Sequence, residues 1–126
     1  MPARELVVAG VAQTQGSMTS KGRGRMVHKP ALVAWRASVA EAWVRTWGEP
    51  TEPLSVPVVA ALEVVKDLEP THRWFGDLDK LQRAIGDALS IDVKVIADDA
   101  LIVGWVASKR RCRPGEMEHA RIRLEW

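Results

Sequence analysis

Apolar residues recur at helical spacing in the segment 30–47. Five of them lie three or four positions apart: Leu32, Trp35, Val39, Trp43 and Trp47. This stripe predicts a helix, with Pro30 in its first turn and Gly48 just after its last turn. Three tryptophans on one helix could stack on nucleic-acid bases, but a stripe at this spacing is more typical of a core or a subunit interface.

A second helix is predicted over 79–90, where apolar residues again share one side. They are Leu78, Leu81, Ile85, Ala88 and Leu89. Asp79, Arg83 and Asp87 form the opposite row, because residues four apart in a helix lie one above the other. This row therefore places an acid and a guanidinium one turn apart on an exposed side.

Strands are predicted where the composition is β-branched or the apolar positions alternate. The segments are 4–12, 54–66, 101–108 and 119–126. The last one alternates most clearly, with these residues on its apolar side: Ala120, Ile122, Leu124 and Trp126. In the second, Pro57 indicates a strand start or an edge position. We expect the last two strands to pair as a hairpin with a basic turn.

Together these elements predict a single α+β domain over residues 1–126. It has a mixed sheet and two main helices, in the order strand, helix, strand, helix, strand, strand. A chain of 126 residues that is 47% hydrophobic and 27% charged suits one globular domain. No apolar run approaches the ~20 residues of a membrane helix, and the first residues lack the pattern of a signal peptide. The single Cys112 excludes a disulfide framework and a multi-cysteine zinc site, so we expect a cytoplasmic protein.

Charge is unevenly distributed, although 18 Lys and Arg against 16 Asp and Glu give a net charge of only +2. Two segments, 21–29 and 109–113, are basic and contain no acid. Their cations are Lys21, Arg23, Arg25, Lys29, Lys109, Arg110, Arg111 and Arg113. Acids concentrate between these segments, over 77–99. A metal-dependent nuclease would show this pattern, with cations on phosphates and carboxylates on a divalent ion, although chance also produces it.

The first basic segment overlaps a polar, glycine-rich stretch, 13–25, which predicts a flexible loop. Two interpretations stay open for this loop. It is either a solvated linker or a basic flap over nucleic acid, since glycines let the backbone approach phosphates closely.

Two pairs of aspartates carry the chemistry that the sequence suggests. Asp77 and Asp79 would point to the same side of an extended segment, and Gly76 favours such an approach to the helix. Their carboxylates could then converge on one ion; alternatively, one of them is an ordinary N-cap. Asp98 and Asp99 could add a ligand, but neighbours in a strand face opposite ways, so only one would reach the site. Oxygen ligands of this kind suit Mg²⁺.

No other nucleophile or ligand cluster is evident in the sequence. The three histidines do not form a helical i, i+4 pair. Cys112 lies between Arg111 and Arg113, which could lower the pKa of its thiol, but we interpret it as an incidental cysteine.

One stretch of the chain resembles the RusA-type Holliday junction resolvases. It runs Gly76-Asp77-Leu78-Asp79-Lys80-Leu81-Gln82-Arg83-Ala84-Ile85-Gly86-Asp87-Ala88-Leu89 and is followed by Asp98-Asp99-Ala100-Leu101-Ile102. The family pattern is an Asp-Leu-Asp-Asn-Leu-x-Lys helix start, an Asp-Ala-Leu end, and an Asp-Asp pair about a helix and a loop later. Gln15-Gly16-Ser17, the basic loop and Trp35-Arg36 look like those of phage-borne members. The resemblance covers most of the chain.

This resemblance implies a Mg²⁺-dependent endonuclease that acts as a homodimer and resolves four-way DNA junctions by paired nicks. It would serve recombination and repair in the cytoplasm of a bacterial or phage-infected cell. Carried over by matching motif, Asp77, Asp79 and Asp99 would be the metal-binding catalytic acids. Asp98 is the less favoured acid of its pair.

Two positions depart from the family pattern. Arg83 stands where the family usually has a catalytic lysine. A guanidinium can stabilise phosphate charge, but it cannot act as a base. Lys80 stands where asparagine is usual, and we count it among the cations that would contact DNA.

Two other classes of function fit the same residues. One is a non-catalytic protein that binds DNA junctions, for which Arg83 is the sequence support. The other is a Mg²⁺-dependent nuclease that acts on other branched DNA or on RNA. Retention of all three candidate acids argues against the first.

Overall fold

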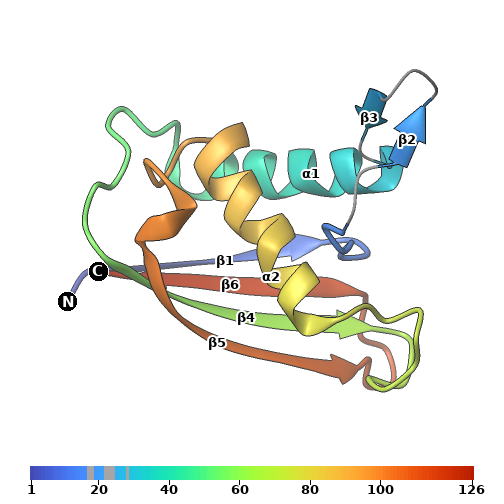
Figure 1. The fold of residues 1–126 in the computed structure, drawn as a ribbon. Coiled ribbons are helices and arrows are strands. Elements are labelled where there is room, and N and C mark those ends of the chain that lie inside the picture. Colours follow the sequence, from blue (N-terminus) through green and yellow to red (C-terminus); the bar gives the residue numbers. More distant parts are fainter. Residues whose placement is uncertain (17–18, 22–24, 28) are drawn as a thin grey trace.

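A four-stranded sheet with two helices packed against it forms the body of the molecule (Figure 1). The computed structural model describes residues 1–16, 19–21, 25–27 and 29–126. The sheet strands are β1 (Ala3–Ala9), β4 (Val58–Lys66), β5 (Ile102–Arg111) and β6 (His119–Glu125). The helices are α1 (Pro30–Trp47) and α2 (Leu78–Asp87). The predicted α+β architecture and the order of its main elements are confirmed.

The strand order is β1-β6-β4-β5. β6 runs antiparallel to both β1 and β4, whereas β5 runs parallel to β4. The predicted hairpin of the last two strands is therefore wrong, because β4 lies between them. The crossover through α2 brings β5 alongside β4 in the same direction, as a helical connection between parallel neighbours does. The segment 112–118 then passes the end of β4 to reach β6.

α1 has the bounds that Pro30 and Gly48 predict. Of its apolar stripe, all but Trp47 are buried. The stripe is therefore mainly core, in line with the interpretation that the sequence favours. Trp47 is partly exposed and donates from Nε1 to the carbonyl of Glu5, at 3.1 Å, which fastens the end of α1 to β1.

The predicted helix over 79–90 is two elements in the structure. α2 ends at Asp87 and continues as one π-helical turn, η1 (Ala88–Asp92). Its apolar side, which includes Leu81, Ile85 and Leu89, is buried against α1 and the sheet. The chain then makes a short 3₁₀ turn, η2 (Asp99–Leu101), before β5.

Three predicted strand bounds need correction. β1 ends at Ala9 rather than at residue 12, and Gly10 leaves the strand with a φ of +120°. β4 begins at Val58 rather than at residue 54, because Pro57 has no N–H for the ladder. Leu54 instead forms an isolated parallel bridge with Ile96. β5 extends to Arg111 rather than stopping at 108, because β4 supplies pairing partners along this length.

The segment predicted as a loop, 13–25, contains strand structure. β2 (Thr19–Lys21) and β3 (Arg25–Val27) pair antiparallel, with Lys21 opposite Arg25. Figure 1 shows this hairpin beside the start of α1 and away from the four-stranded sheet. The basic flap of the sequence analysis is thus at least partly a β-hairpin.

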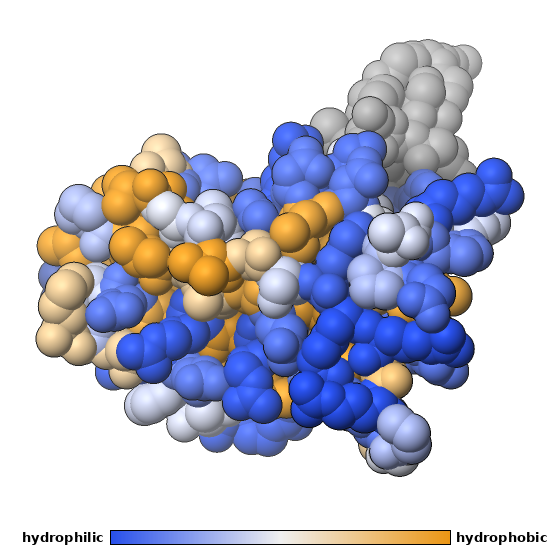
Figure 2. Space-filling model, turned by 90° about the horizontal axis from the view of Figure 1, so that it is seen from below, coloured by the Kyte–Doolittle hydropathy of each residue, from blue (hydrophilic) through white to orange (hydrophobic). Residues whose placement is uncertain are grey.

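The two ends of the sheet differ in surface character. Figure 2 shows hydrophilic side chains gathered on the right, where β4 and β5 end and α2 begins, and apolar surface gathered on the left. The chain begins and ends at the apolar end, where Trp126 donates its backbone N–H to the carbonyl of Pro2, at 3.0 Å. Among the described residues, no helix has the length and apolar character needed to cross a membrane.

Candidate active site at the start of α2

The turn before α2 is fixed by packing and by backbone conformation. Phe75 is fully buried, and Gly76 has a φ of +102°. A Cβ at Gly76 would lie 2.5 Å from Cγ2 of Thr14, so only glycine fits at this position. The turn delivers the chain to Asp77, which is extended with φ −71° and ψ 136°.

Asp77 occupies the N-cap position of α2, yet its carboxylate makes no capping hydrogen bond. The side chain is 72% exposed and lies 3.6 Å from Nζ of Lys80. The interpretation of Asp77 as an ordinary N-cap is therefore not supported. Its carboxylate is free to bind a cation or a polar ligand.

Asp79 lies in the first turn of α2 and is exposed. The predicted extended geometry holds for Asp77 only, because the helix begins at Leu78, one residue before Asp79. The side chains of Asp77 and Asp79 therefore do not point to the same side of one extended segment. The positive end of the helix dipole still favours an ionised carboxylate in this turn.

Asp98 and Asp99 have different surroundings. Oδ1 of Asp98 accepts a hydrogen bond from the backbone N–H of Ala100, at 2.8 Å, and so caps η2. Asp99 lies within η2, is exposed, and has its Cβ 3.8 Å from where a Cβ on Gly86 would be. Asp99 is thus the acid of the pair whose carboxylate is not used by the cap.

The structure places Asp99 beside the later part of α2 rather than beside its start. Gly86 follows Asp79 by seven residues, which corresponds to about 10 Å along a helix axis. In the part of the chain that the structure describes, no group of three His, Cys, Asp or Glu side chains is placed to hold a metal ion. The convergence of Asp77, Asp79 and Asp99 on one ion stays a prediction.

The donors present nevertheless fit Mg²⁺. That ion keeps several waters and takes only one or two carboxylates together with phosphate oxygens of a substrate. Asp77 and Asp79 are exposed carboxylates at a helix start, and Asp77 is free of capping. Arg83 lies one turn after Asp79 on the same side of α2, is exposed, and could hold a phosphate there.

Two lysines converge on the turn before Asp77. Lys66, the last residue of β4, donates from Nζ to the carbonyl of Phe75 at 2.6 Å, and Lys109 of β5 donates to the carbonyl of Gly76 at 3.0 Å. Burial lowers the pKa of Lys66, an effect that the nearby carboxylate of Glu118 opposes. Lys66 is not among the residues predicted for the site, although a lysine at the end of an otherwise apolar strand is a usable signal.

Lys109 was predicted to contact phosphate along with the rest of the segment 109–113. Two neighbouring arginines of this segment form ion pairs with glutamates. Arg110 binds both carboxylate oxygens of Glu116, at 2.6 and 2.7 Å, and Arg111 binds Glu69 at 2.9 Å. These hydrogen bonds raise the pKa of both arginines, and Arg110 lowers the pKa of Glu116 to about 2.

The remaining predicted cations are exposed to solvent or belong to segment 21–25. Lys29, Lys80 and Arg113 are exposed. The backbones of Lys21 and Arg25 face each other in the β2–β3 hairpin, and Arg23 lies outside the described residues.

The N-terminal segment brings the hairpin toward α2. Gln15 donates its backbone N–H to the carbonyl of Lys80, at 3.0 Å, and its Oε1 accepts from Arg36, at 3.4 Å. Arg36 in turn makes two hydrogen bonds to Asp92, at 2.6 and 3.1 Å. These contacts join α1, η1 and the first turn of α2. The residues just before segment 17–27 are therefore held against the first turn of α2.

One exposed aromatic side chain near the site was not singled out from the sequence. Trp74 is 69% exposed and lies three residues before Asp77. The guanidinium of Arg73 lies 5.7 Å from the centre of its ring. A large exposed ring beside a cation is suited to stacking on a base.

The pKa of the Cys112 thiol is raised, whereas its two flanking arginines suggested that it could be lowered. Burial raises the pKa of its thiol, and the carboxylates of Asp67, Glu116 and Glu118 act in the same direction. The flanking arginines have less effect than expected, because Arg111 is paired with acids. The interpretation of an incidental cysteine is consistent with this unreactive setting.

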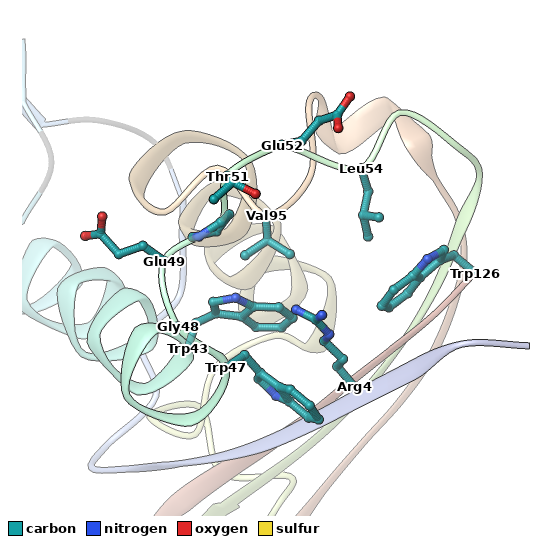
Figure 3. A pocket seen from close by; sticks show the side chains of 11 residues that line it. Arg4, Trp43, Trp47, Gly48, Glu49, Thr51, Glu52, Leu54, Val95 and Trp126 are labelled. Atoms are coloured by element: carbon teal, nitrogen blue, oxygen red, sulfur yellow. The ribbon is translucent and has the colours of Figure 1, made fainter.

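A tryptophan-lined pocket lies at the other end of the sheet, near the chain termini (Figure 3). It has a volume of about 220 Å³. The guanidinium of Arg4 lies 5.0 Å from the ring centre of Trp47 and 6.0 Å from that of Trp126. None of the predicted catalytic acids lines this pocket. The candidate site is therefore the charged end of the sheet and not this cavity.

The chain matches the family model described as Endodeoxyribonuclease RusA over residues 8–125. A search of curated proteins gave no match. The matched range includes all the acids and cations predicted for the site.

Proposed function

The protein belongs to the endodeoxyribonuclease RusA family, and we propose that it is a Mg²⁺-dependent endonuclease that cuts four-way DNA junctions. The observation that carries this proposal is the pair of exposed carboxylates, Asp77 and Asp79, at the start of α2. Both stand at the hydrophilic end of the sheet, and Asp77 lies 3.6 Å from Nζ of Lys80. An acidic centre flanked by cations suits hydrolysis of a polyanion.

Each acid has a distinct role in this proposal. Asp77 and Asp79 would hold the Mg²⁺ ion, and Asp99 would complete its ligand set. When bound, the ion supplies a polarised water and neutralises charge on the scissile phosphate. Arg83 would hold a non-bridging phosphate oxygen from the next turn of α2. Asp98 has a structural role, because it caps η2.

DNA contacts would surround this centre. We assign phosphate contacts to Lys29, Lys80 and Arg113 and to the cations of the β2–β3 segment: Lys21, Arg23 and Arg25. Lys109, Arg110 and Arg111 would add to the positive field at the end of β5. Trp74 offers a ring for stacking at an unpaired or distorted base.

The proposed enzyme is a homodimer that serves recombination and repair in the cytoplasm of a bacterial or phage-infected cell. A four-way junction has two equivalent strands to cut, and a two-fold enzyme matches this symmetry. The face of the sheet opposite the helices offers a surface for the second copy, because Val7, Val59 and Val106 are exposed on it.

A substrate panel tests the proposal. Four-way junctions, flaps, linear duplex and structured RNA are incubated with the protein, with and without Mg²⁺. We expect paired nicks in the four-way junction only when Mg²⁺ is present. Cleavage of flaps or RNA in preference would assign a different nuclease, and junction binding without any cleavage would assign a non-catalytic binding protein.

The Asp79→Asn variant assigns the chemistry to α2. It keeps the size of the side chain but removes its charge, so cleavage should fall on the order of 100-fold or more. Junction binding should persist or tighten, because repulsion of phosphate decreases. Parental cleavage by Asp79→Asn would contradict the assignment of the site.

A further inference from the structure

Two lysines from neighbouring parallel strands hold two consecutive carbonyls. Nζ of Lys66 lies 2.6 Å from the carbonyl oxygen of Phe75, and Nζ of Lys109 lies 3.0 Å from that of Gly76. Each ammonium also lies 5.3 Å from the centre of the Phe75 ring. The two ammonium groups thus hold the backbone of the Phe75–Gly76 turn, which directly precedes Asp77.

Burying the Lys66 ammonium costs free energy of desolvation. Lys66 is only 4% exposed, and an ammonium loses hydration when it is buried. The cost is offset here by the carbonyl of Phe75, by its ring face and by the nearby carboxylate of Glu118. A methionine would fill the same space without this cost, so the charge itself has a use at this position.

The turn is constrained from its other side as well. Thr14 closes the space beside Gly76, and the Phe75 ring is fully buried. The backbone that leads into Asp77 is therefore held by two side-chain cations, one buried ring and one close contact. By contrast, the carboxylate of Asp77 has no capping bond to orient it.

We propose that Lys66 and Lys109 are positioning residues that set the direction of Asp77 and thereby the affinity of the site for a divalent cation. The inference rests on the proposed function, since it takes Asp77 as a cation ligand. It assigns to Lys109 an inward role in addition to a phosphate contact. Both lysines would act through the backbone of the turn, because each ammonium donates to a backbone carbonyl there.

A purely electrostatic role and a positioning role predict opposite changes in cation affinity when Lys66 or Lys109 is replaced. If the lysines acted only through their charge, their removal would make the site more negative and tighten cation binding. If they orient Asp77, their removal lets the turn relax and weakens cation binding. Loss of groups that orient metal ligands weakens binding by about 10- to 100-fold.

The test measures Mn²⁺ binding by electron paramagnetic resonance, with no DNA present. Lys66→Met and Lys109→Met are compared with the parent, with Asp77→Asn, and with Lys94→Met as the matched control. Lys94 is exposed and is not part of the site. Both site variants should raise the Mn²⁺ dissociation constant about 10-fold or more, whereas Lys94→Met should leave it unchanged. Lys109→Arg should recover part of the loss, because a guanidinium can still donate to the carbonyl of Gly76.

Unchanged or tighter Mn²⁺ binding in Lys109→Met would overturn the proposal, as would parental binding that Asp77→Asn does not affect. Lys109 is only half-buried, so this variant decides the matter if Lys66→Met does not fold. The proposed function fails separately. A parent that binds Mn²⁺ through Asp77 but leaves junctions intact would remove the function and keep the positioning role. If the parent cleaves junctions and the lysine variants bind Mn²⁺ normally, the proposed function stands and the positioning role fails.

Discussion

At the scale of single residues, the two adjacent aspartates before β5 differ in how their carboxylates are used. Asp98 accepts a hydrogen bond from the N–H of Ala100, whereas the carboxylate of Asp99 is not used by this cap. Asparagine also caps turns well, so Asp98→Asn should cost well under about 1 kcal/mol of stability and change cleavage little. Asp99→Asn should keep the fold and lower cleavage on the order of 100-fold.

Both variants are compared by junction cleavage rates and by thermal unfolding. The pair serves as its own control, since the change in charge is the same at both positions. A larger loss of cleavage from Asp98→Asn would exchange the two roles.

A second prediction at this scale concerns the glycine before Asp77. Gly76→Ala should destabilise the fold by about 2 kcal/mol or more, because the residue has a positive φ and its new Cβ would press on Thr14. Gly115→Ala is the matched control. It also has a positive φ, of +80°, but nothing lies within 4 Å of its Cβ position.

Urea unfolding of the two variants isolates the steric contribution. Gly115→Ala should lose about 1 kcal/mol from backbone strain alone. Adding Thr14→Ser to Gly76→Ala removes the methyl group that clashes and should recover part of the loss. Equal losses from both alanine variants would contradict the packing argument.

How much of the site could be predicted differs from one residue to the next. The spacing of Asp77, Asp79 and Arg83 along one short stretch is visible in the sequence, and all are exposed on or just before α2. Lys66 could not be connected with Asp77 in this way. Its hydrogen bond to the carbonyl of Phe75 depends on how segment 67–75 folds back onto the end of β4. The bond from Lys109 to Gly76 depends on β4 and β5 being parallel neighbours, and the alternation of apolar residues does not encode which strands pair.

At the scale of elements, α1 shows what makes boundaries predictable. Proline is favoured in a first helical turn and glycine after a last one, and both act through local backbone sterics. Pro30 and Gly48 therefore marked both ends correctly. The expected β5–β6 hairpin failed because it depended on long-range pairing. The chain continues past β4 through segment 112–118, and nothing in that segment indicates which strand β6 will join.

The connection between β5 and β6 gives a prediction on pH. Arg110 and the backbone N–H of Arg113 both donate to Glu116, and they lower its pKa from an ordinary 4.5 to about 2. A carboxylate with a lowered pKa stabilises the folded state above its unfolded value, and this contribution is lost as the pH falls through the folded value. The parent should therefore lose stability between about pH 4.5 and pH 2 in part through Glu116.

Melting temperatures measured across this pH range test the contribution. Glu116→Gln should be less stable than the parent near neutral pH, and the difference should shrink as the pH falls toward 2. Glu52→Gln is the control. Glu52 is exposed and makes no ion pair among the described residues. A difference between Glu116→Gln and the parent that does not depend on pH would rule out this carboxylate as an acid-sensitive contact.

At the scale of the whole molecule, the sheet is covered on only one face. The fold class could be predicted from the sequence because it depends on the types and order of the elements. Which face stays open could not, since apolar residues lie on both sides of β4. On the uncovered face, Val7, Val59 and Val106 are 50%, 40% and 70% exposed. Val59 and Val106 lie on the neighbouring strands β4 and β5, and exposed apolar side chains that lie together are typical of a protein–protein interface.

The open face also carries charged side chains. Glu5 and Arg121 pair at 3.0 Å, and a shallow pocket of about 210 Å³ lies between the charged side chains and Val106. A two-fold interface brings the same patch from both copies together, so acids of one copy can meet arginines of the other. This combination of apolar and paired charged groups is what the proposed homodimer requires.

Val106→Glu tests the dimer, because it places a carboxylate within the apolar part of this face in both copies at once. Light scattering at micromolar concentration should show a dimer for the parent and a monomer for the variant. Val33→Glu is the control, since Val33 is similarly exposed, at 55%, but lies on α1 and away from the open face. If nicking is coupled through the dimer, Val106→Glu should lose paired cuts while single nicks remain. A monomeric parent that makes paired cuts at full rate, or a dimer that Val106→Glu leaves intact, would show that two copies do not meet through this face.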